Sequence, residues 1–379
     1  MRIGINALYI RPGKMGGGEV YFSNLVGALA KLGGKNKYFV FVNKKFVDAF
    51  DFDTDNVTTV SCNLLGDIKP FRVVWEQLIL PFILKKYDID IVHTFSQTGL
   101  IFAPCKSLMT IHDLQHHYYP SNFSLIQRLY LRLMIWITIH QSDKIITISN
   151  NSAKDILNLL KAPEHKVEVV YESSRFGNKP IVVSDMDKDR VRVKYGLDGK
   201  YILSVASILS HKNLNRLICA FDLIASSDVI DLVLVGMKLK ATSEVIATIR
   251  SIGLPESRVK ILGYVPDSDL PALYSMAELF AFPSLFEGFG LPALEAMTFG
   301  CPVVAANSTA IPEVVGNGAL LADPFNPNDF ADKMLSMLTD RQLRNTFIQK
   351  GFERIKQFSW GKSACKVLGI YEDTLNQRN

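Results

Sequence analysis

The stretch that decides the fold runs from Ser284 to Met297 and reads Ser-Leu-Phe-Glu-Gly-Phe-Gly-Leu-Pro-Ala-Leu-Glu-Ala-Met. It follows a short apolar run typical of a buried strand, Leu279 to Phe282, and it leads into a helix. Pro292 suits the first helical turn, where a missing N–H is not needed. The free N–H groups and the positive dipole end at such a helix start favour a phosphate. Gly288 and Gly290 would let the main chain approach that ligand closely.

Short β-branched runs alternate with helix-like stretches on both sides of this motif, which is typical of βαβ units stacked into parallel sheets. The first series of expected strands comprises Arg2 to Asn6, Lys37 to Val42, Val57 to Ser61, Ile89 to Thr94, Ser107 to Ile111, Lys144 to Ile148 and Val167 to Tyr171. The second series comprises Tyr201 to Ala206, Asp231 to Val235, Val259 to Leu262, Leu279 to Phe282, Pro302 to Ala305 and Ala319 to Leu321. A polar stretch without sustained periodicity, Glu172 to Arg190, separates the two series.

We therefore expect an α/β protein with two Rossmann-like, doubly wound parallel-sheet domains, at residues 1–180 and 181–355. A helix-like segment from Gly361 to Leu375, within residues 356–379, is expected to pack back on the first domain. A chain of 379 residues with 48% hydrophobic composition can build two such cores. Parallel sheets bind ligands at the carboxyl ends of their strands, so the chemistry is expected in a cleft between the facing domains.

The N-terminus and the cysteines indicate a cytoplasmic protein. The strand-like run from Arg2 to Leu8 leads straight into a glycine loop and does not resemble a secretory leader. The five cysteines have no short paired spacing, which argues against a disulfide framework or a structural zinc site and favours buried free thiols.

The net charge of +5 is unevenly distributed. Residues 1–180 carry 21 Lys and Arg against 15 Asp and Glu, while the remainder carries 21 against 22. A basic half suits an anionic partner such as a lipid pyrophosphate or the inner membrane leaflet, although an ordinary solvated surface explains it equally well. The apolar segment from Leu125 to Ile139 contains Arg128 and Arg132 and is too short to span a bilayer, but it could lie on a membrane surface.

Two carboxylates bracket the decisive helix start. Glu287 lies in the loop and Glu295 within the helix, so both could border one ligand. Carboxylates accept hydrogen bonds from sugar or ribose hydroxyls. Alone, such glutamates are more often surface charges. The surrounding glycines and proline reverse that preference.

The stretch resembles the signature of the family-four retaining glycosyltransferases of the GT-B fold. The resemblance continues through Cys301-Pro302-Val303-Val304-Ala305, Pro312-Glu313-Val314 and Leu321-Ala322-Asp323-Pro324. Upstream, it includes Ser210-His211-Lys212-Asn213-Leu214 and Gly263-Tyr264-Val265-Pro266 with Leu273-Tyr274. It spans nearly the whole chain and is densest from Ser204 to Pro324.

The resemblance implies roles for individual residues of the second domain. Glu287 would hold hydroxyls of the donor sugar, Glu295 would bind the ribose, and Lys212 would neutralise the pyrophosphate. The donor site would also include Ser207, His211, Val265, Gly288, Phe289, Gly290 and Leu291. The family often has basic residues where this chain has His211, Ser207 and Ala206, so the second phosphate cation is either a protonated His211 or an arginine from elsewhere.

In the first domain, Gly16-Gly17-Gly18-Glu19 precedes a helix expected near Val20. Glycine loops of this kind can admit phosphates or serve tight turns alone; the resemblance assigns Gly17 and Gly18 to the donor site. His112 and Asp113 end an expected strand and are candidate catalytic residues by position and resemblance. His93, at another strand end, is a weaker candidate. The stretch from Phe71 to Leu78 resembles an acceptor-side helix, although its apolar positions also suit a core helix.

We expect a retaining, metal-independent hexosyltransferase that needs no cofactor and does not bind nucleic acid. Its donor would be a GDP- or UDP-linked sugar, with mannose favoured. The acceptor would be a glycan or a lipid-linked oligosaccharide in surface polysaccharide biosynthesis, and the inner face of the plasma membrane a possible peripheral contact. The alternatives are a catalytically weak glycan- or nucleotide-sugar-binding subunit and a nucleotide-sugar epimerase or phosphorylase. A dehydrogenase ranks last, because it would leave the second-domain signature unexplained.

Overall fold

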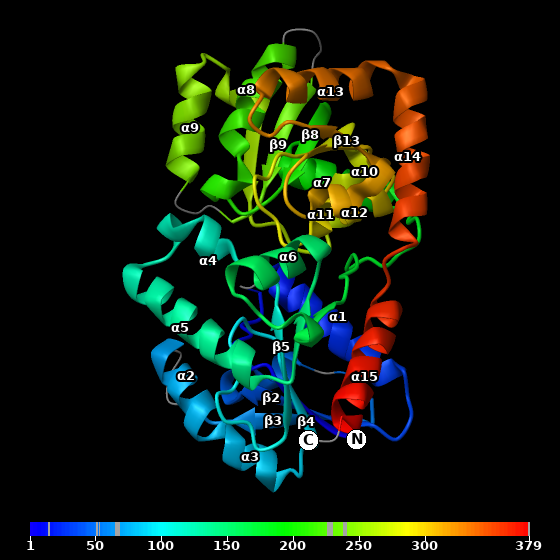
Figure 1. Cartoon of the computed structure of the whole chain (residues 1–379). Helices are drawn as coiled ribbons and strands as arrows, with labels where there is room; N and C mark the ends of the chain where they lie inside the picture. Colours follow the sequence, from blue (N-terminus) through cyan, green and yellow to red (C-terminus); the bar gives the residue numbers. More distant parts are fainter. Residues whose placement is uncertain are drawn as a thin grey trace. The chain divides into compact units, whose positions relative to one another are not determined.

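The computed structural model describes residues 1–13, 16–50, 52, 54–64, 69–225, 230–237 and 241–377, with the backbone alone at 69 and 70. The chain forms two compact units, coloured along the chain in Figure 1. Unit 1 comprises Met1–Glu172 with Trp360–Asn379, and unit 2 comprises Ser173–Ser359. The first boundary therefore lies before the expected residue 180, and the return to unit 1 lies after the expected residue 356.

Unit 1 is built on a parallel sheet of seven strands in the order β3-β2-β1-β4-β5-β6-β7. The strands are β1 (Arg2–Asn6), β2 (Lys37–Asn43), β3 (Val57–Cys62), β4 (Ile91–Thr94), β5 (Lys106–Ile111), β6 (Lys144–Thr147) and β7 (Val167–Val169). Each residue of β4 is buried, as expected for a parallel strand covered on both faces.

The helices of unit 1 cover this sheet. They are α1 (Gly17–Lys31), α2 (Lys69–Leu78), α3 (Leu80–Lys86), α4 (Gln115–Tyr118), α5 (Leu125–Gln141), α6 (Asn150–Leu159) and α15 (Trp360–Asn376). Leu80 and Leu84 of α3 pack on β2 and β3, and Ile135 of α5 and Ile156 of α6 pack on β5 and β6. The last helix, α15, lies against α1 in this unit.

Unit 2 repeats the plan with a parallel sheet of six strands in the order β10-β9-β8-β11-β12-β13. The strands are β8 (Lys200–Val205), β9 (Ile230–Val235), β10 (Val259–Gly263), β11 (Leu279–Phe282), β12 (Val303–Ala306) and β13 (Ala319–Ala322). In both units the first strand lies between the second and the fourth, so successive crossovers run in opposite directions from it. This reversal is the topological switch point at which doubly wound sheets bind ligands.

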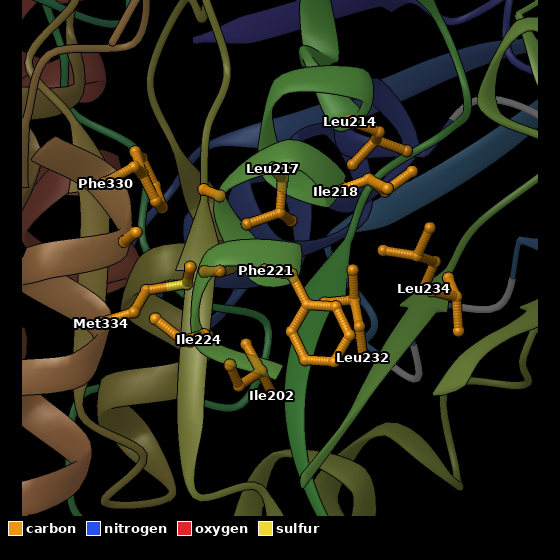
Figure 2. Close-up of a cluster of buried hydrophobic side chains, with 14 of the residues drawn as sticks. Ile202, Leu214, Leu217, Ile218, Phe221, Ile224, Leu232, Leu234, Phe330 and Met334 are labelled. Atoms are coloured by element: carbon orange, nitrogen blue, oxygen red, sulfur yellow. The ribbon is translucent and has the colours of Figure 1, made fainter. Parts of the chain in front are cut away.

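The helices of unit 2 are α7 (Asp185–Tyr195), α8 (Leu214–Ala225), α9 (Thr242–Ser251), α10 (Leu270–Met276), α11 (Leu291–Thr298), α12 (Ile311–Val315), α13 (Pro327–Thr339) and α14 (Arg341–Ile355). Figure 2 shows how α8 and α13 contribute to one buried cluster with β8 and β9. Phe221 of α8 and Met334 of α13 are fully buried there. Such burial contributes roughly 1.5–3 kcal/mol per large apolar side chain.

Two local features differ from the sequence expectations. The polar stretch from Glu172 to Arg190 includes the start of α7, where Ser184 accepts a hydrogen bond from Asp187 N and caps the helix. Helix α1 begins at Gly17 and not near Val20, so Gly17 and Gly18 form its first turn.

Candidate functional site

The loops after β8 and β11 meet at the switch point of unit 2. The backbone N–H of Leu285, after β11, donates to the carbonyl of His211, after β8, at 2.8 Å. Lys212 and Glu287 extend from these two loops, and Lys212 Nζ lies 2.7 Å from Glu287 Oε1. The two residues that the sequence analysis placed in one site are therefore in direct contact.

Asn213 fixes the loop after β8 that carries Lys212. The three-residue 3₁₀ turn Ser210–Lys212 ends at Asn213, which adopts the left-handed conformation with φ of 59°. Asparagine tolerates that conformation better than most residues. Its side-chain amide donates to the carbonyls of Pro283 and Pro324, at 3.0 and 2.8 Å. The residue after Lys212 thus ties the β8 loop to the ends of β11 and β13.

Glu287 is positioned by the loop after β12. Its backbone N–H donates to Thr309 Oγ1 at 3.0 Å. Thr309 has a φ of 48°, a strained value for a β-branched residue. The neighbouring Ser308 hydroxyl donates to the Leu285 carbonyl at 2.5 Å. The loops after β11 and β12 are thereby joined beside the carboxylate.

Helix α11 starts as the sequence predicted, with Pro292 in its first turn. Gly290 is the N-cap residue with a φ of 129°, a conformation that favours glycine, and it gives no side-chain cap. Phe289 and Leu291 are buried on either side of it. Phe289 also packs edge-on against Phe358 at a ring-centroid distance of 5.5 Å. The helix start is therefore rigidly held, and Gly288 beside it is buried as well.

The remaining donor-site candidates lie at the same sheet edge. Ser207 follows β8 and is half-buried, and Val265 follows β10 and is 4% exposed. Gly236, after β9, lies so close to Ala206 that a Cβ would be 2.0 Å from the Ala206 carbonyl oxygen. Its N–H donates to the Gly263 carbonyl at 2.8 Å. The sequence analysis did not single out Gly236, because a lone glycine after a strand carries no distinctive pattern.

His211 differs from the expectation of a protonated phosphate cation. Its side chain is 2% exposed. Burial, with a further contribution from Lys212, lowers the pKa of His211 to about 3. The imidazole is therefore neutral near pH 7 in this structure, which argues against a protonated His211 as the second cation.

Glu295 is more enclosed than the sequence suggested. Its side chain is 1% exposed, Oε1 accepts from Arg175 Nε at 2.7 Å, and Oε2 accepts from Tyr274 Oη at 3.0 Å. Arg175 also pairs with Asp267 at 2.7 Å. Burial works against the charge of Arg175, but Glu295 and Asp267 raise its pKa above the ordinary value. Arg175 was not predicted from the sequence, because it is separated from Glu295 by 120 positions and lies in no motif.

In unit 1, His112 follows β5 and is oriented by Glu172. Its Nδ1 lies 3.4 Å from Glu172 Oε1, and its ring meets Tyr21 edge-on at a centroid distance of 4.7 Å. Burial raises the pKa of Glu172, against the opposing effect of its hydrogen bond with His112. The buried Nε2 of His112 has no hydrogen-bond partner among the described residues. The sequence analysis treated Glu172 only as the start of the linker and missed its contact with His112.

Asp113 and the glycine turn have local partners. Asp113 Oδ1 accepts from the backbone N–H of Gln115 at 2.9 Å, which shapes the turn into α4. Gly16 is the N-cap residue of α1 with no side-chain cap, and Glu19 of its first turn accepts from Gly13 N at 2.9 and 3.0 Å.

His93 is a structural residue, which corrects its expected place at a ligand site. Its Nδ1 lies 2.7 Å from Tyr371 Oη of α15, and its Nε2 lies 2.7 Å from Thr110 Oγ1 of β5. Burial, with a contribution from His112, lowers its pKa to about 3. With both ring nitrogens engaged, His93 joins β4 to β5 and to the last helix.

Across the described ranges, no group of three or more His, Cys, Asp or Glu is placed to hold a metal ion. No helix in the part of the chain described by the structure is both long and apolar enough to cross a bilayer.

Both halves of the chain are similar to known glycosyltransferases. Residues 15–173 match the model for Glycosyltransferase Family 4, and residues 185–354 match the model for Glycosyl transferases group 1. The O-antigen chain mannosyltransferase B of Escherichia coli is 31% identical over 270 residues, covering 70% of each chain. A sucrose-phosphate synthase from Thermosynechococcus elongatus has a TM-score of 0.77 at 22% identity, covering 98% of each chain. The Anabaena protein HepE in complex with UDP-glucose has a TM-score of 0.75 at 20% identity, covering 98% of this chain and 100% of HepE. The chain is therefore a group 1 glycosyltransferase, and its two Rossmann-like units are those of the GT-B fold.

Proposed function

We propose that this glycosyltransferase moves a hexose, with mannose favoured, from a GDP- or UDP-linked sugar to a glycan or lipid-linked acceptor with retention of configuration. The observation that carries the proposal is the 2.7 Å contact between Lys212 and Glu287 at the switch point of unit 2. The name of the E. coli relative supports mannose and a role in surface polysaccharide synthesis. The UDP-glucose complex of HepE supports a nucleotide-sugar donor.

The donor would exchange the contact between Lys212 and Glu287 for two contacts of its own. Lys212 would turn to the diphosphate, whose charge grows as the sugar leaves. Glu287 would then accept hydrogen bonds from hydroxyls of the donor sugar. The N–H groups at the start of α11, with Gly290 leaving room for a ligand, would complete the phosphate site. In this proposal no metal or other cofactor takes part.

The transfer itself would follow a front-face course. The bond between the anomeric carbon and the phosphate oxygen breaks, and the acceptor oxygen bonds to that carbon on the same face. The acceptor proton passes to the departing phosphate oxygen, so the reaction balances without a separate base. In unit 1, His112 Nε2 would hydrogen-bond a hydroxyl of the transferred sugar, with Glu172 holding the ring in place.

A thermal-shift panel of GDP, UDP, GDP-mannose and UDP-hexoses, followed by product analysis with lipid-linked acceptors, tests this function. We expect one nucleotide series to stabilise the protein and the corresponding sugar to be transferred with the anomeric configuration of the donor. An inverted product would refute retention. If no nucleotide sugar stabilises the protein and none is consumed, the whole proposal fails.

A catalytically weak nucleotide-sugar-binding subunit is the second candidate, favoured by the neutral, buried His211. Lys212 would then be the principal cation of the phosphate site, and the leaving group would receive less stabilisation. Donor binding without transfer to any acceptor in the panel would support this alternative.

A further inference from the structure

One side of unit 1 exposes apolar side chains on three helices. They come from α2, α3 and α5, from Ile79 between α2 and α3, and from the loop after β4, and each is between 43% and 80% exposed. We call them the α2–α5 face: Phe71, Val74, Leu78, Ile79, Phe82, Phe102, Leu125, Ile126, Leu129, Leu133 and Trp136. Soluble monomers seldom expose so many large apolar side chains together, and such a patch commonly marks an interaction site.

The spacing along each helix makes continuous stripes. On α5, Ile126, Leu129, Leu133 and Trp136 follow one another at steps of three and four, which places them on one helix face. On α2, Phe71, Val74 and Leu78 repeat the pattern, and Phe82 of α3 extends it by a further four residues. The opposite faces of α3 and α5 supply Leu84 and Ile135 to the core.

The loop that carries Phe102 joins α2 to α5. The side-chain amide of Gln77 in α2 donates to the Gly99 carbonyl at 3.1 Å and accepts from Ile101 N at 2.9 Å. A Cβ on Gly99 would lie 3.5 Å from Thr138 Cβ of α5. Figure 1 shows α5 passing beside α2 in unit 1. The exposed stripes therefore belong to one neighbourhood of unit 1.

The charges in these helices are of one sign at the surface. Over residues 71–86 and 125–141, the acidic residue is Glu76, which is 3% exposed and pairs with Arg72. Lys85, Lys86 and Arg132 are exposed, and Arg128 is half-buried. A second copy of this face would bring these cations against each other. An anionic bilayer would instead receive the cations in its headgroup layer and the leucine and aromatic side chains below it.

We propose that the α2–α5 face docks unit 1 on the surface of an anionic lipid bilayer. The helices lie in the plane of the interface, with the apolar stripes inserted into the headgroup boundary and the cations beside the lipid phosphates. Phe71, Phe82, Phe102 and Trp136 supply the aromatic anchors common at this depth. The proposal concerns a surface distant in sequence from Lys212 and Glu287, so it stands independently of the donor assignment.

Vesicle flotation of the whole chain tests the proposal. The vesicles contain phosphatidylcholine alone, or equal parts of phosphatidylcholine and phosphatidylglycerol. We expect binding to the anionic vesicles, weakened by salt, and much weaker binding to the neutral ones. Arg128→Gln with Arg132→Gln should weaken binding by about 30-fold, because each basic residue near an anionic surface contributes about fivefold. Leu129→Ser with Trp136→Ser should weaken it by at least about tenfold.

Matched substitutions in unit 2 provide the controls. Val193→Ser removes an apolar side chain that is 81% exposed on α7, and Arg250→Gln removes a cation whose side chain is 69% exposed on α9. Both should leave flotation unchanged. Circular dichroism and the thermal shift with nucleotide establish that each variant is folded.

The result that overturns the proposal is absence of binding to anionic vesicles, equal binding to both vesicle types, or equal losses in the unit 2 controls. Mass photometry addresses a second copy as the occupant. A wild-type dimer that becomes monomeric in the α5 variants would also overturn it.

Discussion

The two sheets have corresponding strand orders. The polar groups at their carboxyl edges differ in the partners that they have. In unit 2, Lys212 pairs with Glu287 and Arg175 with Glu295. In unit 1, the buried His112 Nε2 and Tyr9 Oη have no hydrogen-bond partner within the described ranges. The difference lies in the charged groups: Ser204 Oγ and Ser284 Oγ of unit 2 are also buried without a hydrogen-bond partner within the described ranges, but a ligand that contacts Lys212 or Glu287 must first exchange their ion pair, whereas a ligand at His112 Nε2 can satisfy a group that has no partner.

The largest effect on activity is expected at the ion pair between Lys212 and Glu287, which the donor would have to exchange. Lys212→Ala should lower kcat by about 10²–10³-fold, because it removes the cation proposed to stabilise the leaving diphosphate. Steady-state kinetics with a saturating donor measure this loss. Lys260→Ala is the control. Lys260 of β10 pairs with Asp231 of β9 at 3.4 Å, and removing this lysine should leave kcat within about twofold of the parent value. Turnover at the parent rate in Lys212→Ala would refute the proposed role of Lys212 at the donor diphosphate.

The first edge is tested through His112. His112→Ala should lower kcat/KM by about 100-fold if His112 holds a hydroxyl of the transferred sugar as proposed, because the variant removes that hydrogen bond. Glu172→Gln keeps the shape of the side chain but removes the carboxylate that orients the His112 ring. We expect kcat/KM to fall roughly tenfold and its pH profile to change. A fall in melting temperature without a change in kinetics would make both residues structural.

Burial of His93 makes the stability of unit 1 depend on pH. The pKa of His93 is lowered from 6.5 to about 3, mainly by burial. As the pH falls below 6.5 the unfolded chain takes up a proton that the folded chain rejects, so the free energy of unfolding falls until about pH 3. The slope from this residue is about 1.4 kcal/mol per pH unit.

Urea unfolding at pH 7 and pH 5 checks that slope. His93→Gln, which can still reach Tyr371 and Thr110 with its amide, should lose stability less steeply between the two pH values than the parent chain. Identical slopes in the two proteins would show that His93 is not the group that titrates.

The smallest effect concerns the second ion pair of unit 2. If Glu295 binds the ribose, Arg175 competes with the nucleotide for its carboxylate. Arg175→Gln should then tighten nucleotide binding by roughly fivefold, because the competent state becomes more populated, and Glu295→Gln should weaken it. Calorimetric titration measures both constants. Unchanged nucleotide affinity in Arg175→Gln would assign the pair a structural role, and weaker binding would refute the competition and indicate that Arg175 itself helps to bind the nucleotide.

Much of the fold could be predicted because parallel strands buried on both faces form short continuous apolar runs. Leu279–Phe282 and Arg2–Asn6 were predicted at their observed bounds, and the expected family and GT-B fold are confirmed. The start of α7 was missed because its helix is polar, with Val191 as its buried residue, and so lacks an apolar stripe.

The candidate site could be predicted only where its residues belong to local motifs. Lys212 and Glu287 each lie in a distinctive stretch, and the fold brings them together. Glu172, Arg175 and Thr309 were not predicted, because each acts through a contact with a distant segment and lies in no recognisable pattern. Burial also lowers the pKa of His211, and the residues around it in the sequence did not indicate that it would be buried.

The return of α15 to unit 1 bears on the order in which the protein assembles during translation. Val367 and Tyr371 are fully buried in unit 1, although they follow all of unit 2 in the chain. A ribosome releasing the chain from its N-terminus would therefore present unit 2 in full before the core of unit 1 can close. Until then the surface of α1 that receives α15 remains uncovered, so this nascent intermediate exposes apolar surface that the finished protein buries.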